Sequence, residues 1–432
     1  MAEKFVINGG KALNGTVEIS GAKNAAVAIL PATVLSEGIC VIENLPRIAD
    51  VFIVLKIIKN LGAKVKLDEN GTATIDTTEI NGHVVDKELA ERMRASYYFL
   101  GALLGRCGEA EVAMPGGCVI GQRPIDLHKK GLRALGATIE TDFGKMTAHA
   151  DELVGKDIYL DQVSVGATIN IMLAAVKAKG NTTIVNAAKE PHVVDVANFL
   201  NCMGAKIKGA GTDIIKIRGV EKLHGCTYAV IPDQIETGTL MIAAAATQGD
   251  VTVQNVIPTH MEALSQKLSE MGVYVEEGDD YIRVKGNGRP RSVNIKTLPY
   301  PGFPTDLQQP MTVLLSTANG TSVIVENIFE ARFKHIDEIR RMGAKVTIDD
   351  RIAVVNGVDR LTGAPVKATD LRAGAALIIA GLMAEGTTEI FNIKYIERGY
   401  DHIDDKLVKL GADIIRVKEE PKAEENFETE FK

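Results

Sequence analysis

Arginines recur in short loops that precede predicted helices, at corresponding places along the chain. Arg123, Arg332 and Arg398 occupy three of six such loops. A guanidinium group binds a carboxylate or a phosphate through two parallel hydrogen bonds. Any one of these arginines is equally well explained as a solvated surface residue, but their recurrence favours a site for an anionic substrate.

Cationic side chains also stand where predicted helices begin. Lys23, Arg94 and Arg372 lie in the segments GAKN, MRAS and DLRAG, each followed by an apolar run. Corresponding helix starts carry the segments SVGA (164–167), QIETG (234–238) and FPTD (303–306). The first turn of a helix offers free backbone N–H groups and about half a positive charge, which suits bound anions.

Cys118 lies among glycines in the segment PGGCVIGQRP, five residues before Arg123. A thiol in an exposed loop near cations ionises readily and is reactive, so we predict that Cys118 is functional. The remaining cysteines are interpreted as small apolar side chains of the core: Cys40, Cys107, Cys202 and Cys226.

Asp306 ends the segment FPTD in a proline-rich loop, and two roles are open for it. It could cap the following helix, which is the commoner role for an aspartate at such a place. It could also act as a general base. Local sequence alone slightly favours the cap.

The composition excludes several classes of protein. A net charge of −7 argues against a general nucleic-acid or membrane-surface binder. The five cysteines form no CxxC pair, and the histidines lack metal-ligand spacing, so no metal site is expected. No signal peptide is recognised, and apolar stretches such as 373–384 fall short of the roughly 18–20 residues of a membrane span. We therefore expect a cytoplasmic protein with reduced thiols.

A sixfold internal repeat organises the chain of 432 residues. Glycines of an apolar-Gly-Ala or apolar-Gly-Val motif stand at positions 62, 136, 204, 272, 343 and 411. A second series of glycines, each after an apolar segment, stands at 38, 108, 180, 249, 320 and 386. Two markers with one period predict six units, and glycine after a helix is expected in the left-handed conformation.

The first helix of each unit is apolar nearly all round, as in 375–384, and must be buried on all sides. The strands alternate polar and apolar residues, which is typical of a half-exposed sheet. These patterns predict an α/β protein of two inside-out domains, each with three units of buried helices and outward-facing sheets.

Several units end with the motif Gly-x3-Leu-x-Gly, which the sixth unit lacks. A further copy of this motif, which belongs to no complete unit, lies near the N-terminus at Gly9, Leu13 and Gly15. We therefore expect residues 1–20 to complete the sixth unit. The predicted domains are 21–230 and 1–20 plus 231–418, joined by two crossings. The acidic tail, 419–432, is expected to be disordered.

Several motifs together resemble the UDP-N-acetylglucosamine 1-carboxyvinyltransferase family. They are GAKNA (21–25), MRAS (93–96), PGGC and RPIDLH within 115–128, SVGAT (164–168), NAAKEP (186–191), FPTDLQ (303–308), ATDLRAGAAL (368–377) and ERGY (397–400). The resemblance implies two inside-out domains of three repeats. It also implies transfer of the enolpyruvyl group of phosphoenolpyruvate to the 3′-hydroxyl of UDP-N-acetylglucosamine, the first committed step of peptidoglycan synthesis. No metal or organic cofactor is implied.

The resemblance also implies roles for individual residues. Lys23 and Asn24 would contact phosphoenolpyruvate, and Arg123 and Arg398 would bind its anionic groups. Cys118 would be the proton donor and the thiol that fosfomycin alkylates, and Asp306 would face the sugar hydroxyl as the base. The remaining implied substrate-binding residues are Arg94, Pro124, Ile125, Asp126, Leu127, Ser164, Val165, Gly166, Ile328 and Arg372.

Two alternatives stay open at this point. The sister enzyme that acts on shikimate 3-phosphate shares the fold and the enol donor, although the PGGC and RPIDLH segments argue against it. A non-catalytic repeat-ring binding protein is the other.

The chain departs from the usual family pattern at Gln162, Gln234 and Ala331, near the expected nucleotide site and one arginine loop.

Overall fold

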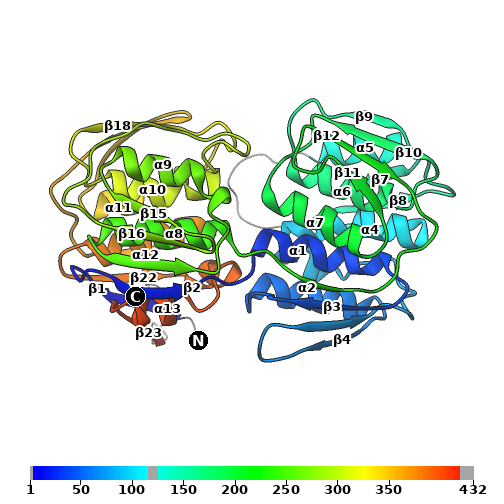
Figure 1. The fold of residues 1–432 in the computed structure, drawn as a ribbon, viewed down its shortest axis with the longest axis horizontal. Helices are drawn as coiled ribbons and strands as arrows, with labels where there is room; N and C mark the ends of the chain where they lie inside the picture. The colour runs from blue at the N-terminus through cyan, green and yellow to red at the C-terminus, as the bar shows by residue number, and fades with distance from the viewer. Residues whose placement is uncertain (1–2, 115–124, 419–432) are drawn as a thin grey trace, which may run out of the picture.

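The computed structural model describes residues 3–114 and 125–418. Figure 1 shows two lobes with helices inside and strands outside. We call residues 22–230 the first lobe, and residues 3–19 with 235–418 the second lobe. Cys118, Arg123 and Pro124 lie outside the described residues, as does the tail predicted over 419–432.

Six helices fill the interior of the two lobes. They are α1 (Lys23–Ala32), α4 (Tyr98–Cys107), α6 (Val165–Ala175), α8 (Gln234–Ala246), α10 (Gln308–Leu315) and α12 (Leu371–Met383). In α12 every residue from Leu371 to Leu382 is buried, as expected of a helix without a polar face. Helix α12 packs against α8 and α10, and α4 packs against α6. The inside-out α/β fold is therefore confirmed.

The second helix of each unit covers the central helices. These helices are α2 (Ala49–Asn60), α5 (Asp126–Ala134), α7 (Pro191–Cys202), α9 (Glu262–Glu270), α11 (His335–Arg341) and α13 (Ile403–Lys409), with an additional short helix α3 (Lys87–Arg92). The glycines of the first series follow these helices, all with φ between 88° and 108°. A side chain at such a φ is strained, so glycine ends each helix there.

The second series of glycines departs from the expectation at two positions. Gly38 and Gly249 do not have positive φ, and at the latter place Gln248 takes the left-handed conformation with φ of 56°. Gly249 is required for a different reason, because a Cβ there would lie 2.0 Å from the carbonyl oxygen of Leu13. The expectation of a left-handed glycine was therefore wrong at both positions.

The described strands form six sheets, three in each lobe. In the first lobe the orders are β13-β3-β5-β4, β6-β8-β7 and β11-β12-β10-β9. Their bounds are β3 (Ile39–Glu43), β4 (Lys64–Leu67), β5 (Ala73–Asp76), β6 (Glu109–Ala113), β7 (Thr138–Asp142), β8 (Lys145–His149), β9 (Asp157–Tyr159), β10 (Asn181–Val185), β11 (Lys206–Lys208), β12 (Ile214–Arg218) and β13 (Thr227–Ala229).

In the second lobe the orders are β15-β16-β14-β2, β17-β18-β20-β19 and β21-β22-β1-β23. The strands are β1 (Glu3–Asn8), β2 (Asn14–Glu18), β14 (Asp250–Gln254), β15 (Tyr274–Glu277), β16 (Tyr281–Lys285), β17 (Ile295–Lys296), β18 (Thr321–Val325), β19 (Lys345–Asp349), β20 (Ile352–Asn356), β21 (Pro365–Lys367), β22 (Thr387–Phe391) and β23 (Asp413–Lys418). Each lobe is thus enclosed by three sheets.

The N-terminal strands lie in the second lobe. Strand β1 runs antiparallel to β22 and to β23, and Phe5 lies opposite both Ile390 and Arg416. It takes the place that β20 has between β18 and β19 in the neighbouring sheet. Strand β2 runs parallel to β14. The buried apolar residues of the two lobes form separate clusters, and on this ground we propose 21–230 and 1–20 plus 231–418 as the domains.

Phe5→Ala is expected to destabilise the second lobe by about 3–5 kcal/mol, because the side chain is only 1% exposed and its loss leaves a cavity. Urea unfolding followed by circular dichroism measures the change. Phe143→Ala is the matched control, since that ring is 92% exposed and should contribute almost nothing. Equal unfolding midpoints for the two variants would contradict the packing of β1.

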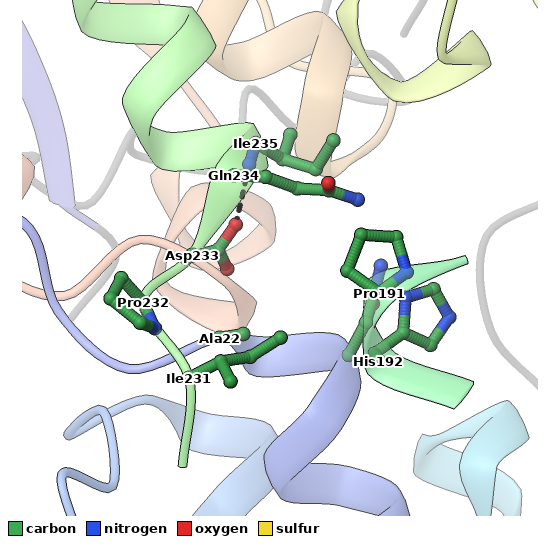
Figure 2. Close-up of a pocket in the computed structure, with 9 residues that line it drawn as sticks. Ala22, Pro191, His192, Ile231, Pro232, Asp233, Gln234 and Ile235 are labelled. Carbon is green, nitrogen blue, oxygen red and sulfur yellow. Dashed lines mark hydrogen bonds between the residues drawn. The ribbon is translucent and has the colours of Figure 1, made fainter. Parts of the chain in front are cut away.

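The two crossings between the lobes are fastened to each other. The N–H of Ala22 donates to the carbonyl of Ile231 (2.7 Å), and the N–H of Asp233 donates to the carbonyl of Ser20 (2.9 Å). The Asp233 carboxylate caps α8 and also accepts from the N–H of Lys23 at 2.9 Å. Figure 2 shows these crossings around a small pocket, with His192 of α7 beside them. One aspartate thereby fixes the starts of α1 and α8.

Candidate active site

A cleft of about 780 Å³ is lined by residues of both lobes. Every predicted site residue within the described part of the chain lines it except Ile125, which is buried directly before α5. The residues that the structure brings together are Lys23, Asn24, Arg94, Asp126, Leu127, Ser164, Val165, Gly166, Asp306, Ile328, Arg372 and Arg398. Segments far apart in the sequence therefore meet at one place.

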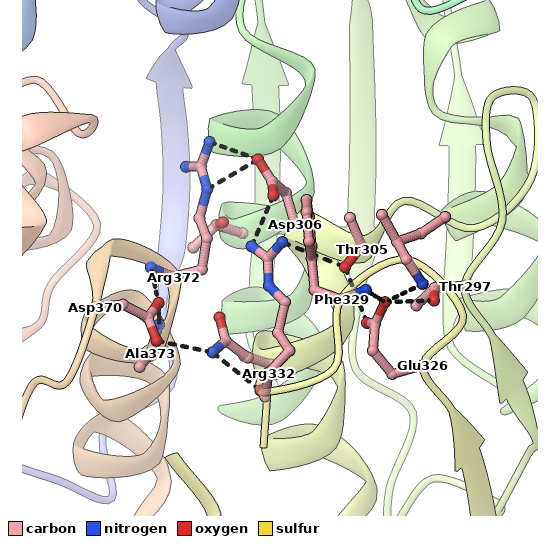
Figure 3. Close-up of polar contacts among 12 residues, drawn as sticks. Thr297, Thr305, Asp306, Glu326, Phe329, Arg332, Asp370, Arg372 and Ala373 are labelled. Atoms are coloured by element: carbon pink, nitrogen blue, oxygen red, sulfur yellow. Dashed lines mark hydrogen bonds and ion pairs between the residues drawn. The ribbon is translucent and has the colours of Figure 1, made fainter. Parts of the chain in front are cut away.

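Asp306 lies between two buried arginines, as Figure 3 shows. Its Oδ1 accepts from Nη2 of Arg332 at 2.7 Å, and its Oδ2 accepts from Nη2 of Arg372 at 3.1 Å. Burial tends to raise the pKa of this carboxyl, but Arg372 and Arg332 outweigh burial and hold the pKa well below its usual range. The side chain caps no helix. The cap that local sequence favours is therefore wrong, because two distant cations bind the carboxylate instead.

Polar contacts behind this carboxylate fix both arginines and the neighbouring loop, where the hydroxyl of Thr305 accepts from Nη1 of Arg332 at 3.3 Å. Asp370 accepts from the N–H of Arg372 at 3.0 Å and so holds the start of α12. Glu326 accepts from the hydroxyl of Thr305 (2.9 Å) and from the N–H of Ile328 (2.8 Å). Within the described residues, Nη1 of Arg372 and Nε of Arg332 are buried without a hydrogen-bond partner. A buried donor without a partner is costly, which favours an anion there.

A second charge cluster lies at the start of α1. Nζ of Lys23 is 3.0 Å from Oδ2 of Asp50, and Nε of Arg398 is 2.9 Å from Oδ1 of the same carboxylate. Burial lowers the pKa of the Lys23 ammonium, and the positive charges of Arg372 and Arg398 lower it further, whereas Asp50 raises it. The net pKa of Lys23 lies below its usual value, and Asp50 is the group that opposes this shift.

The first lobe supplies the other wall of the cleft. Arg94 lies 5.5 Å above the ring of Tyr97, and burial lowers the pKa of its guanidinium. Ser164 caps α6 by accepting from the N–H of Ala167 at 3.3 Å. Gly166 follows, and a Cβ there would lie 2.9 Å from Nε2 of His128. Helix α6 therefore begins at the cleft, where its free N–H groups suit a phosphate.

Sequence reasoning assigned no role to two charged residues of the clusters around Asp306 and Lys23, namely Arg332 and Asp50. Arg332 was recognised as a recurring loop arginine but received no role. Asp50 was not recognised as a site residue, although it lies at the start of a second helix. In two other units the segment before the second helix carries an arginine near the cleft, Arg332 or Arg398. That correspondence between units is the signal that could have found it.

The cysteines differ from their interpretation as core side chains. Cys40 is buried, but Cys226 is only half-buried, and Cys107 and Cys202 are exposed. The interpretation was therefore wrong for the two exposed thiols, which end helices α4 and α7 at the surface.

Neither a metal-binding cluster nor a membrane-spanning helix is present in the described part of the chain. No group of three or more His, Cys, Asp or Glu side chains there is arranged to hold a metal ion. Among the helices of 3–114 and 125–418, none is long and apolar enough to cross a membrane.

Comparison with known proteins identifies relatives over nearly the whole chain. Residues 7–407 match the family model described as EPSP synthase (3-phosphoshikimate 1-carboxyvinyltransferase). UDP-N-acetylglucosamine 1-carboxyvinyltransferase 2 of Clostridium acetobutylicum is 59% identical, over 96% of this chain and 100% of the relative. UDP-N-acetylglucosamine 1-carboxyvinyltransferase 3 of Caldanaerobacter subterraneus subsp. tengcongensis is 60% identical with the same coverage.

Solved structures have the same fold. The enolpyruvyl transferase NikO from Streptomyces tendae superposes with a TM-score of 0.88 at 27% identity, covering 97% of this chain and 100% of that one. EPSP synthase from Acinetobacter baumannii superposes with a TM-score of 0.74 at 19% identity, covering 97% of this chain and 100% of that one, and supports the fold alone. These relatives are named as enzymes, which disfavours a non-catalytic ring protein. The chain belongs to the UDP-N-acetylglucosamine 1-carboxyvinyltransferases, within the wider EPSP synthase family.

Proposed function

We propose that this protein transfers the enolpyruvyl group of phosphoenolpyruvate to the 3′-hydroxyl of UDP-N-acetylglucosamine and releases phosphate. In this role it begins peptidoglycan synthesis in the cytoplasm. The observation that carries the proposal is the pair of charge clusters in the cleft, each with two cations around one carboxylate. Each cluster has a net charge of +1 and therefore retains attraction for an anion.

Phosphoenolpyruvate carries more negative charge than the sugar hydroxyl with which it reacts. We therefore place it beside Lys23, Arg372 and Arg398, the cations at the junction of the two clusters. Lys23 and Arg398, with Asn24 at the start of α1, would bind the phosphate and carboxylate of phosphoenolpyruvate. Arg372 adds its buried Nη1, which has no partner among the described residues. Preorganised cations in a closed cleft stabilise the charge that develops on the departing phosphate.

The acceptor would occupy the wall of the first lobe. Its diphosphate suits Arg94 and the beginning of α6 at Ser164, Val165 and Gly166. Asp126 and Leu127 at the start of α5 complete this wall. Arg123 and Pro124, outside the described residues, and the buried Ile125 are proposed as further residues of the acceptor site from the family resemblance alone. Ile328, held by Glu326, would lie beside the N-acetylglucosamine ring.

The proposed chemistry is addition followed by elimination. Asp306 accepts the proton of the sugar hydroxyl while that oxygen bonds to C2 of the enol, and Cys118 donates a proton to C3. The tetrahedral ketal then loses phosphate from C2, and the leaving phosphate takes up the proton held by Asp306. The Cys118 thiolate takes a proton back from C3, which restores the double bond. A strongly paired carboxylate is a weak base, so binding of phosphoenolpyruvate to Arg372 must weaken its contact with Asp306 and raise the pKa of Asp306.

The acceptor distinguishes this proposal from the sister reaction. Phosphate release from phosphoenolpyruvate should require UDP-N-acetylglucosamine and should not occur with shikimate 3-phosphate alone. A coupled phosphate assay with each acceptor offered separately measures this. Release that depends on shikimate 3-phosphate would refute the assignment of the acceptor and support the other member of the wider family.

A further inference from the structure

Asp50 links three elements of the site, although the mechanism proposed above gives it no role. It lies in the first turn of α2 in the first lobe, and its side chain is only 4% exposed. Lys23 approaches it from the start of α1 at 3.0 Å. Arg398, which belongs to the second lobe, donates from Nε at 2.9 Å and from Nη2 at 3.3 Å. Both carboxylate oxygens are therefore engaged by cations.

A purely local role does not explain this arrangement. An acidic residue in the first turn commonly stabilises a helix through its dipole, and such a residue is normally solvated. Here the carboxylate is buried, and its partners come from two other elements. The stem of Lys23 also packs closely, since a Cβ on Gly399 would lie 3.0 Å from its Cδ. The contacts therefore constrain the two cations more than they stabilise α2.

We infer that Asp50 is a positioning residue that holds Lys23 and Arg398 side by side across the two lobes, so that both donate to the same anionic group of phosphoenolpyruvate. This inference rests on the proposed function. Two cations alone would repel each other in a buried site, and the carboxylate offsets that repulsion. The resulting cluster has one net positive charge in a fixed geometry, and it costs less to bury than two unpaired cations.

The charge of Asp50 also affects the protonation of Lys23. The charged groups that act on the ammonium are Asp50 of α2, Arg372 of α12 and Arg398, while the Asp233 carboxylate contacts its backbone N–H and Asp306 is influenced by its charge. Burial and the two arginines lower the pKa of Lys23, and Asp50 opposes them. Removing the charge of Asp50 therefore lowers the pKa of Lys23 further, and the ammonium is lost at a lower pH.

Asp401 offers a matched control at the same junction of the lobes. Its Oδ2 accepts from the N–H of Arg47, in the loop before α2, at 2.9 Å. Its side chain is 16% exposed, and its Oδ2 also accepts a hydrogen bond from the hydroxyl of Ser20 at 3.5 Å. Asp401 thus joins the second lobe to the loop before α2, much as Asp50 joins Arg398 to α2. Unlike Asp50, Asp401 is not among the groups that shift the pKa of Lys23.

The test compares Asp50→Asn with Asp401→Asn. Asp50→Asn should lower kcat/KM for phosphoenolpyruvate about 10- to 100-fold, mainly through a higher KM, because a charge-assisted contact loses its geometry. The alkaline limb of the kcat/KM profile should move to lower pH. Asp401→Asn should leave both the KM and the alkaline limb near their wild-type values, and Asp50→Glu, which keeps the charge, should retain the wild-type alkaline limb.

Titration calorimetry with phosphoenolpyruvate adds a readout that does not depend on turnover. Weaker binding to Asp50→Asn than to Asp401→Asn, at equal thermal stability, supports the positioning role. Unchanged binding and an unmoved alkaline limb would overturn it, as would tighter binding, since that would mean that Asp50 competes with the substrate. An inactive wild-type enzyme would instead count against the proposed function, because calorimetry would still measure the contribution of Asp50 to anion binding.

Discussion

Replacing Asp306 by Asn is expected to lower kcat about 100- to 10,000-fold, the usual contribution of a positioned general base. The amide occupies nearly the same volume, but it cannot accept the hydroxyl proton. The KM for UDP-N-acetylglucosamine should change much less than kcat. Steady-state rates of phosphate release with both substrates at saturation measure the effect.

A structural role for Asp306 makes a different prediction. If the carboxylate served only to neutralise Arg332 and Arg372, its loss would appear as lower stability and a changed KM for phosphoenolpyruvate. Thermal unfolding of Asp306→Asn with and without sulfate separates the two roles, because an anion can replace the missing charge but not the base. Recovery of turnover as well as stability on adding sulfate would contradict the assignment of Asp306 as the base.

Arg372→Met is expected to lower kcat/KM for phosphoenolpyruvate about 10- to 150-fold, because hydrogen bonds to charged groups contribute roughly 1.5–3 kcal/mol. Methionine fills much of the buried space over the ring of Tyr400 but offers no donor to an anion. Arg372 also lowers the pKa of Asp306. Without it that pKa rises, so the acidic limb of the kcat profile should move to higher pH.

Arg283→Met is the control for the loss of an arginine. Arg283 pairs with Asp250 through two hydrogen bonds of 2.8 Å, but it lies on β16, away from the cleft. The Arg283 side chain is 42% exposed, and ion pairs at the surface contribute little to stability. Comparable losses of kcat/KM in the two variants, or an acidic limb that Arg372→Met does not move, would show that Arg372 acts only through stability.

Local pattern was sufficient for much of the fold. The all-round apolar character of 375–384 predicted a buried helix, and α12 is buried throughout. The recurring glycines predicted where second helices end, since φ near 100° is a local requirement that only glycine meets easily. Gly249 shows the limit of this reasoning, because its need for glycine comes from the distant carbonyl of Leu13.

The charge pairs of the site were harder to predict from the sequence, because their partners are distant in the chain and meet only in the tertiary structure. Asp306 has the local sequence of a helix cap, and its actual partners Arg332 and Arg372 lie 26 and 66 residues away. Asp50 resembles any acidic residue in a first turn, and its partner Arg398 is 348 residues away in the other lobe. A charge at a helix start can be read from the sequence, but the counter-ion that sets its pKa cannot.

The position of β1 between β22 and β23 has a consequence for synthesis of the protein on the ribosome. Residues 22–230 are contiguous and can fold while the chain is still growing, but Phe5 must wait for a partner strand that ends at Lys418. At about 5–20 residues per second, the first strand remains unpaired for roughly 20–80 s. During that time the side chains of Phe5 and Ile7 are exposed to other nascent chains, so β1 is made long before the strands that bury it.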